Sequence, residues 1–154
     1  MCLKTSQIVP LIAERDIPVY KVLLYRNNDQ SYYRFPELEP IRYFAPYNPA
    51  FEYVEGINVA NRDYKVSNPV DNDGIVAYGW LHAFLDLKAA LNLGKMFQKE
   101  NKYSRYMVTC MIIPKGSKYY VSCDSVEICS DKLYWKPDYE NGQLIEKEEE
   151  ISWK

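Results

Sequence analysis

The sequence is poor in the residues that most often build a recognisable active or metal site. One histidine and six glycines occur in 154 residues, and none of the four cysteines forms a C-x-x-C pair. A histidine-rich metal site is therefore excluded, and the spacing of Cys123 and Cys129 does not match the common zinc patterns. We expect no bound metal and free, mostly buried thiols. The alternative is a disulfide between Cys110 and Cys123, if these two lie on neighbouring strands.

The sequence also lacks an excess of charge of one sign and a long apolar run. Lys and Arg number 19, Asp and Glu number 21, and the net charge is −2. The basic residues are scattered, whereas nucleic-acid binding depends on clustered Lys and Arg, so we expect no nucleic-acid partner. No stretch is long enough to cross a bilayer, and the apolar run 8–13 is too short for a secretory signal. We therefore expect no membrane partner and a cytoplasmic location.

What the sequence does contain is the composition of one ordinary globular domain, with 47% hydrophobic and 26% charged residues. A chain of this length buries about two thirds of its unfolded surface. No repeat or linker divides it, so we predict a single domain over residues 1–154. Its parts are an N-terminal arm at 1–17, a core at 18–135 and an acidic C-terminal segment at 136–154.

Prolines break the N-terminal half into short extended pieces. Seven of the nine prolines lie there, and each removes a backbone donor, so the segment 32–49 is expected to be loop-rich. The run 19–25 is mostly apolar on both faces and predicts a strand buried on two sides. Further short strands are predicted at 51–54, 57–60 and 75–78, the last after a turn at 71–74.

The C-terminal half contains the clearest helix and strand patterns. Asp86 is a good N-cap, and the apolar stripe behind it predicts an amphipathic helix over about 87–99. The alternating run 106–113 predicts a strand, followed by a turn with Gly116 at positive φ and a second strand at 118–121.

A further strand, or a short turn and a strand, is predicted over 126–133. Strands on both sides of one helix predict an α+β fold, with a mainly antiparallel sheet packed against one main helix at about 87–99. The N-terminal half of this fold is expected to be rich in loops.

The candidate chemistry centres on the single histidine. His82 lies in the segment 79–84, between a predicted strand and the helix cap, where functional residues are common. The alternative is that His82 bonds to the main chain at this junction, wedged between Trp80 and Phe84. No partnered nucleophile stands at a diagnostic spacing, so we lean towards a protein that is not an enzyme.

Fifteen tyrosines are an excess, and many lie in predicted loops and strand ends. Tyrosine suits interfaces and ligand grooves because it combines a large apolar area with a polar tip. The alternative is that a small domain with many short strands uses tyrosine on half-buried faces. The residues that we predict to bind a ligand or partner are Trp80, His82, Tyr119, Tyr120 and Tyr134.

Four segments, taken in order, resemble a family of small uncharacterised bacterial and phage proteins. They are 19–23, 79–84 with the helix that follows, 107–120 and 129–133. Members of this family read roughly Y-K, G-[FL]-H-[AS], P-x-G and [CS]-[ST]-x-[KR]-[LI]. The match covers about residues 18–135. It implies the cytoplasm of a bacterium or of a phage-infected host, and it implies no known activity.

The same order of elements is similar to the ADP-ribosyltransferase superfamily, in which a Y-[KRH] strand opens the fold and a later strand ends in P-x-G. This likeness implies NAD as the cofactor, with His82, Glu127 and Tyr20 as candidate catalytic residues. Lys21 occupies the position where such enzymes keep an Arg or His.

Two main functions follow from these observations, and a structural or assembly subunit is a third option. The first is a binding or interaction protein without a cofactor, encoded by a phage or mobile element. It would hold a host protein, a second copy of itself or a small ligand in a tyrosine-lined groove. The alternative is an ADP-ribosyltransferase-like enzyme that acts on NAD.

Overall fold

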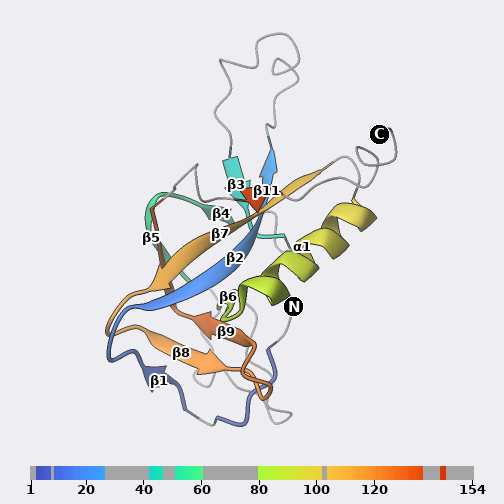
Figure 1. Ribbon diagram of the computed structural model, residues 1–154. Helices are drawn as coiled ribbons and strands as arrows, with labels where there is room; N and C mark the ends of the chain where they lie inside the picture. The colour runs from blue at the N-terminus through green and yellow to red at the C-terminus, as the bar shows by residue number, and fades with distance from the viewer. Residues whose placement is uncertain are drawn as a thin grey trace, which may run out of the picture.

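The computed structural model describes residues 3–7, 9–26, 42–46, 51–60, 80–101, 104–136 and 143–144. In this part of the chain a large antiparallel sheet packs against a single helix (Figure 1). The described residues therefore contain the predicted antiparallel sheet and main helix, and this mostly β arrangement with one helix is consistent with the predicted α+β class. The predicted turn at 71–74, the strand at 75–78 and most of the proline-rich and acidic segments lie outside the described residues.

The described elements follow one another in a simple order. They are β1 (Leu11–Ile12), β2 (Ile17–Arg26), β3 (Arg42–Phe44), β4 (Glu52–Tyr53), β5 (Gly56–Val59), β6 (Leu81–Phe84), α1 (Leu87–Glu100), β7 (Arg105–Ile113), β8 (Lys118–Val121), β9 (Glu127–Ser130), β10 (Lys132–Trp135) and β11 (Gln143–Leu144). The main path of the sheet is β1-β8-β9-β6-β2-β7-β10-β5. The strands β3 and β4 extend from β2, and β11 pairs with β7.

The centre of the sheet is the pair β2 and β7, the two strands with the strongest sequence patterns. They pair over nine positions, from Ile17 opposite Ile113 to Tyr25 opposite Arg105. Val19 and Leu23 are buried on one face and Val22 and Leu24 on the other, which confirms burial on two sides over residues 19–24. Burial of each such side chain stabilises the fold by about 1.5–3 kcal/mol.

The helix begins and ends close to its predicted bounds. The amide of Lys88 donates to the Asp86 carboxylate at 3.3 Å, so Asp86 is the N-cap. The apolar stripe packs on the sheet, where Phe97 stacks on Tyr106 of β7 with the ring centroids 5.4 Å apart. The helix continues to Glu100, one residue beyond the prediction.

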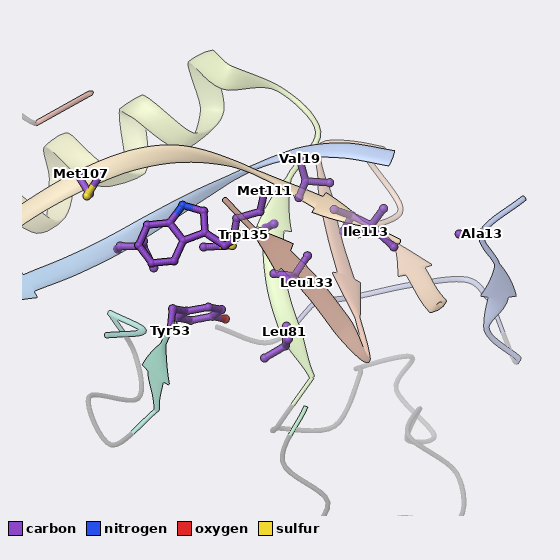
Figure 2. Packing of buried hydrophobic residues seen from close by; sticks show 12 residues of the cluster. Ala13, Val19, Tyr53, Leu81, Met107, Met111, Ile113, Leu133 and Trp135 are labelled. Atoms are coloured by element: carbon purple, nitrogen blue, oxygen red, sulfur yellow. The ribbon is translucent and has the colours of Figure 1, made fainter. Parts of the chain in front are cut away.

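The two faces of the sheet bury different sets of side chains because residues along a strand point alternately to opposite sides. The face that α1 covers, here called the helix face, includes Val22, Phe84 and Val108. The other, here called the opposite face, carries a larger cluster; Figure 2 shows Met111 and Trp135 among its members.

The N-terminal segment before β1 lies along the edge of β8. The amide of Cys123 donates to the carbonyl of Lys4 at 3.0 Å. The hydroxyl of Thr5 donates to the carbonyl of Val121 at 2.8 Å, and the amide of Val121 donates to the side chain of Gln7 at 2.8 Å. These bonds use backbone groups that an uncovered edge strand would leave free.

Two turns differ in how well the sequence predicted them. Gly116 has φ 89° and the amide of Ser117 donates to Pro114 at 3.0 Å, as the predicted turn requires. The region predicted as 126–133 contains two strands, because Asp131 interrupts it and its carboxylate accepts the amide of Lys118 at 2.9 Å.

The predicted burial of the cysteine thiols was only partly right. Cys110, Cys123 and Cys129 are free, and only Cys129 is buried among them. Cys110 lies on an exposed part of the helix face, and Cys123 lies in the turn between β8 and β9. The expectation of mostly buried thiols was therefore wrong for two of the three, and these two do not form the alternative disulfide.

Candidate functional site

His82 lies within a strand rather than in a loop between a strand and the helix. It is the second residue of β6, and it stands directly opposite Cys129 of β9. Leu81 and Ala83 point to the opposite face, so His82 and Phe84 point to the helix face. The predicted junction was wrong because apolar residues on both sides of a short segment also fit a buried strand.

A row of three side chains crosses three neighbouring strands on the helix face. Cys129 of β9 stands opposite His82 of β6 and also opposite Tyr120 of β8. Neighbouring strands are about 4.8 Å apart, so the row spans about 10 Å. Trp80 packs edge-on against Tyr120 with the ring centroids 5.3 Å apart, and Leu3 is fully buried beside them. These five residues are called the His82 cluster below.

Two polar atoms of the His82 cluster are buried without a hydrogen-bond partner in the described part of the chain. They are Nδ1 of His82 and Oη of Tyr120. Most buried polar atoms in proteins are hydrogen-bonded, and an unmade bond costs about 1–3 kcal/mol. The row therefore has unmet hydrogen-bonding capacity at two positions on the helix face.

The ionisable groups of the cluster are uncharged at neutral pH. Burial, and then the nearby charge of Lys21, lowers the pKa of His82 to about 3. Burial raises the pKa of Tyr120, and it raises the pKa of Cys129 to about 12. A neutral imidazole has one donor and one acceptor nitrogen, and a phenol can donate or accept. The cluster therefore offers hydrogen bonds of both kinds without net charge.

The neighbouring Cys129 and His82 are not an activated pair. Catalysis by cysteine needs a thiolate, and thiolates form at exposed, electropositive positions. The thiol of Cys129 is fully buried, and its burial raises its pKa to about 12, so the thiolate is disfavoured. The arrangement therefore favours binding over nucleophilic chemistry.

A buried lysine lies behind His82, on the opposite face. Lys21 of β2 is 8% exposed, and its Nζ donates to the main-chain carbonyl of His82 at 2.5 Å. The same Nζ lies 5.2 Å from the ring centroid of Tyr53. Burial lowers the pKa of Lys21 to about 8 and raises that of Tyr53 well above its ordinary range. In the described residues no carboxylate forms an ion pair with this ammonium.

The structure brings together three of the five predicted binding residues: Trp80, His82 and Tyr120. Tyr119 points to the opposite face and lines a surface hollow of about 800 Å³ near Leu11. Tyr134 lies on β10, which β2 and β7 separate from β6. Tyr119 and Tyr134 therefore lie apart from Tyr120.

The three candidate catalytic residues share the helix face, but they are not in contact as one group. Tyr20 stands opposite Phe84, and Phe84 stands opposite Glu127. The buried side chain of Phe84 thus lies between Tyr20 and Glu127. His82 lies two residues before Phe84 on the same strand.

The sequence interpretation missed the parts of the site that depend on strand register. Cys129 joins His82 only because β9 pairs with β6, and Leu3 is 77 positions before Trp80. Lys21 did have a local signal, because it is the one charged residue inside the apolar run 19–25. A lone charge inside a strand that is buried on both faces needs a partner.

Comparisons of the chain with protein-family models, with curated proteins and with solved structures find no match. The two resemblances inferred from short motifs therefore remain predictions. Within the described residues no group of His, Cys, Asp or Glu side chains is arranged to hold a metal ion. In the same part of the chain no helix is long and apolar enough to span a membrane.

Proposed function

We propose that the chain is a binding protein that holds a small uncharged ligand at the His82 cluster. The observation that carries this proposal is the pair of buried atoms without partners, Nδ1 of His82 and Oη of Tyr120. Because both atoms are buried, a compact group that enters the cluster suits them better than a flat protein surface does.

The chemistry of the cluster selects the class of ligand. His82, Tyr120 and Cys129 are all uncharged at neutral pH, for the reasons given above. A charged ligand would lose its hydration there without gaining an opposite charge from the side chains of the His82 cluster. An uncharged ligand that can both donate and accept hydrogen bonds, such as an amide or a lactam, matches the bonding types of the two unpaired atoms. Trp80 and Tyr120 add apolar ring surface beside it.

The test is a panel of small amides and lactams, matched in size by carboxylates and amines. Binding is measured by thermal shift and by ligand-observed NMR. We expect uncharged members to raise the melting temperature of the wild type. Tyr120→Phe should abolish the rise in melting temperature. Tyr134→Phe is the matched control: it removes the same hydroxyl group at a partly exposed position outside the cluster and should keep the rise. Binding only by charged compounds, binding retained in Tyr120→Phe or no binding at all would contradict the proposal.

One observation favours the alternative enzyme. His82, Tyr20 and Glu127 share the helix face of three successive strands, and burial raises the pKa of Glu127. NAD therefore belongs in the same panel, with release of nicotinamide as a second readout. Turnover that Glu127→Gln abolishes would favour the ADP-ribosyltransferase-like function over simple binding.

A further inference from the structure

The lysine on the opposite face reaches the main chain of the proposed binding site. We propose that Lys21 is a positioning residue for His82: its ammonium fixes the β6 main chain and thereby the direction of the imidazole. The use of this positioning in ligand binding rests on the proposed function, but the positioning itself can be tested without a ligand.

The pairing of the strands explains why the main chain needs such support. In the described residues β2 pairs with β6 only where Tyr20 faces Phe84. If the antiparallel pairing of β2 and β6 continued, Val22 would stand opposite His82, but these two residues are not paired. On its other side β6 pairs with β9 at four positions. The ammonium of Lys21 bonds to the carbonyl of His82 beside the point where the β2–β6 pairing stops, and it therefore acts in place of a backbone donor.

The choice of a lysine has a second consequence for His82. A buried ammonium without an ion-pair partner is unfavourable, because burial penalises its charge. That charge also acts on the imidazole, since Lys21 is the second cause, after burial, of the lowered pKa of His82. The same side chain therefore orients His82 and helps to keep it neutral.

The other titratable groups that face this pair come from three further strands. Tyr53 of β4 faces Lys21, and its pKa is raised by burial. Cys129 and Tyr120 face His82 from β9 and β8, and both are neutral at pH 7. Glu127 lies two residues from Cys129 on the same face, and its carboxyl has a raised pKa.

The experiment is an NMR pH titration of the imidazole, which needs no assignment because His82 is the single histidine. We expect the wild type and Lys21→Arg to titrate below pH 5. Lys21→Met should raise the midpoint towards 6.5, because the positive charge and the bond to the carbonyl are both lost. The control is Thr109→Val, which changes the residue opposite Lys21 and should leave the midpoint unchanged. Equal midpoints in folded Lys21→Met and wild type would overturn the proposal.

A second measurement on the wild type covers the case in which Lys21→Met does not fold. The carbonyl carbon of His82 should change its chemical shift with a midpoint of about 8, as Lys21 loses its proton. The carbonyl carbon of Ala83 serves as the control and should change less. Absence of a transition at His82 between pH 7 and 9 would overturn the proposal. Failure of the ligand panel would leave both results unchanged, so the two proposals fail separately.

Discussion

Two regions of one sheet bury polar groups in opposite ways. On the opposite face, Trp135 Nε1 donates to Thr109 Oγ1 at 3.3 Å, and Lys21 Nζ donates to the carbonyl of His82. On the helix face, His82 Nδ1 and Tyr120 Oη have no partner among the described residues. An unmade buried hydrogen bond costs about 1–3 kcal/mol. The first region therefore stabilises the fold, and the second is the region that we propose as a binding site. Unmet hydrogen-bonding capacity, and not burial alone, distinguishes them.

Asn58 shows the same architectural use of a buried polar side chain. Its Oδ1 accepts the amide of Val54 at 2.9 Å, and its Nδ2 donates to the carbonyl of Val54 at 2.9 Å and to that of Leu133 at 3.3 Å. These bonds fix the connection between β4 and β5 and tie it to β10. The opposite face therefore uses its buried polar groups to hold strands together.

The largest effect is expected from Lys21→Ala, which should lower the free energy of unfolding by about 3 kcal/mol. The change leaves a cavity in the core and an unpaired carbonyl at His82. Urea unfolding at pH 10 measures it, because the folded side chain is uncharged there and its burial carries no charge penalty. Lys21→Met fills the same volume and should lose less. A loss below about 1 kcal/mol in Lys21→Ala under these conditions would show that the Lys21 nitrogen is not a structural donor.

The pH dependence of stability should report the same lysine. The pKa of Lys21 is about 8 in the folded protein and 10.5 in the unfolded chain, so the unfolded chain binds more protons between these values. Stability should therefore rise by about 2 kcal/mol from pH 8 to 10 in the wild type but not in Lys21→Met. Above pH 10 Tyr53 acts in the other direction, because its phenol loses the proton first in the unfolded chain. A flat wild-type profile in urea unfolding from pH 8 to 10 would contradict this assignment.

A smaller effect is expected from Thr109→Val, about 1–2 kcal/mol of lost stability. The substitution keeps the shape but leaves the buried Nε1 of Trp135 without its acceptor. Thr109→Ser keeps the hydroxyl and should retain the bond, so it separates this effect from packing. Equal unfolding midpoints in urea for Thr109→Val and the wild type would show that the Trp135–Thr109 bond does not stabilise the opposite face. The two faces would then not differ in how their buried polar groups contribute to stability.

The smallest loss is expected at the helix cap, where a polar contact is exposed. Asp86→Ala removes the acceptor of the Lys88 amide and should cost about 1 kcal/mol. Asp86→Asn should keep most of the stability, because asparagine is an equally good N-cap. Thermal unfolding of the two variants measures how much stability one solvent-exposed hydrogen bond contributes. If Asp86→Ala lost more stability than Thr109→Val, the view that buried hydrogen bonds contribute more than exposed ones in this protein would be wrong.

The sequence predicted the elements that local patterns determine. Asp86 and the apolar stripe behind it gave the helix, and alternation along 106–113 gave β7. Gly116 marked its turn because positive φ favours glycine. These features depend on residues a few positions apart, so a single chain is sufficient to predict them.

The site could not be predicted in the same way, because it depends on contacts between distant strands. Cys129 lies beside His82 through the β6–β9 register, and Tyr120 joins them through the β8–β9 register. The tyrosine excess predicted ring surface but not which face each ring occupies, and Tyr119 and Tyr120 point to opposite faces. These two tyrosines are neighbours in the sequence, but they lie on different faces of the sheet because side chains alternate along a strand.

The most direct test of the contrast between the two faces is the free energy of unfolding of Tyr120→Phe without ligand, measured in urea beside Thr109→Val. Removal of an unpaired buried hydroxyl should leave stability unchanged or raise it by up to about 1 kcal/mol, whereas Thr109→Val should lose stability. A loss of about 1 kcal/mol or more in Tyr120→Phe would show that the hydroxyl already has a partner in the folded protein. That result would contradict the assignment of the His82 cluster as a binding site.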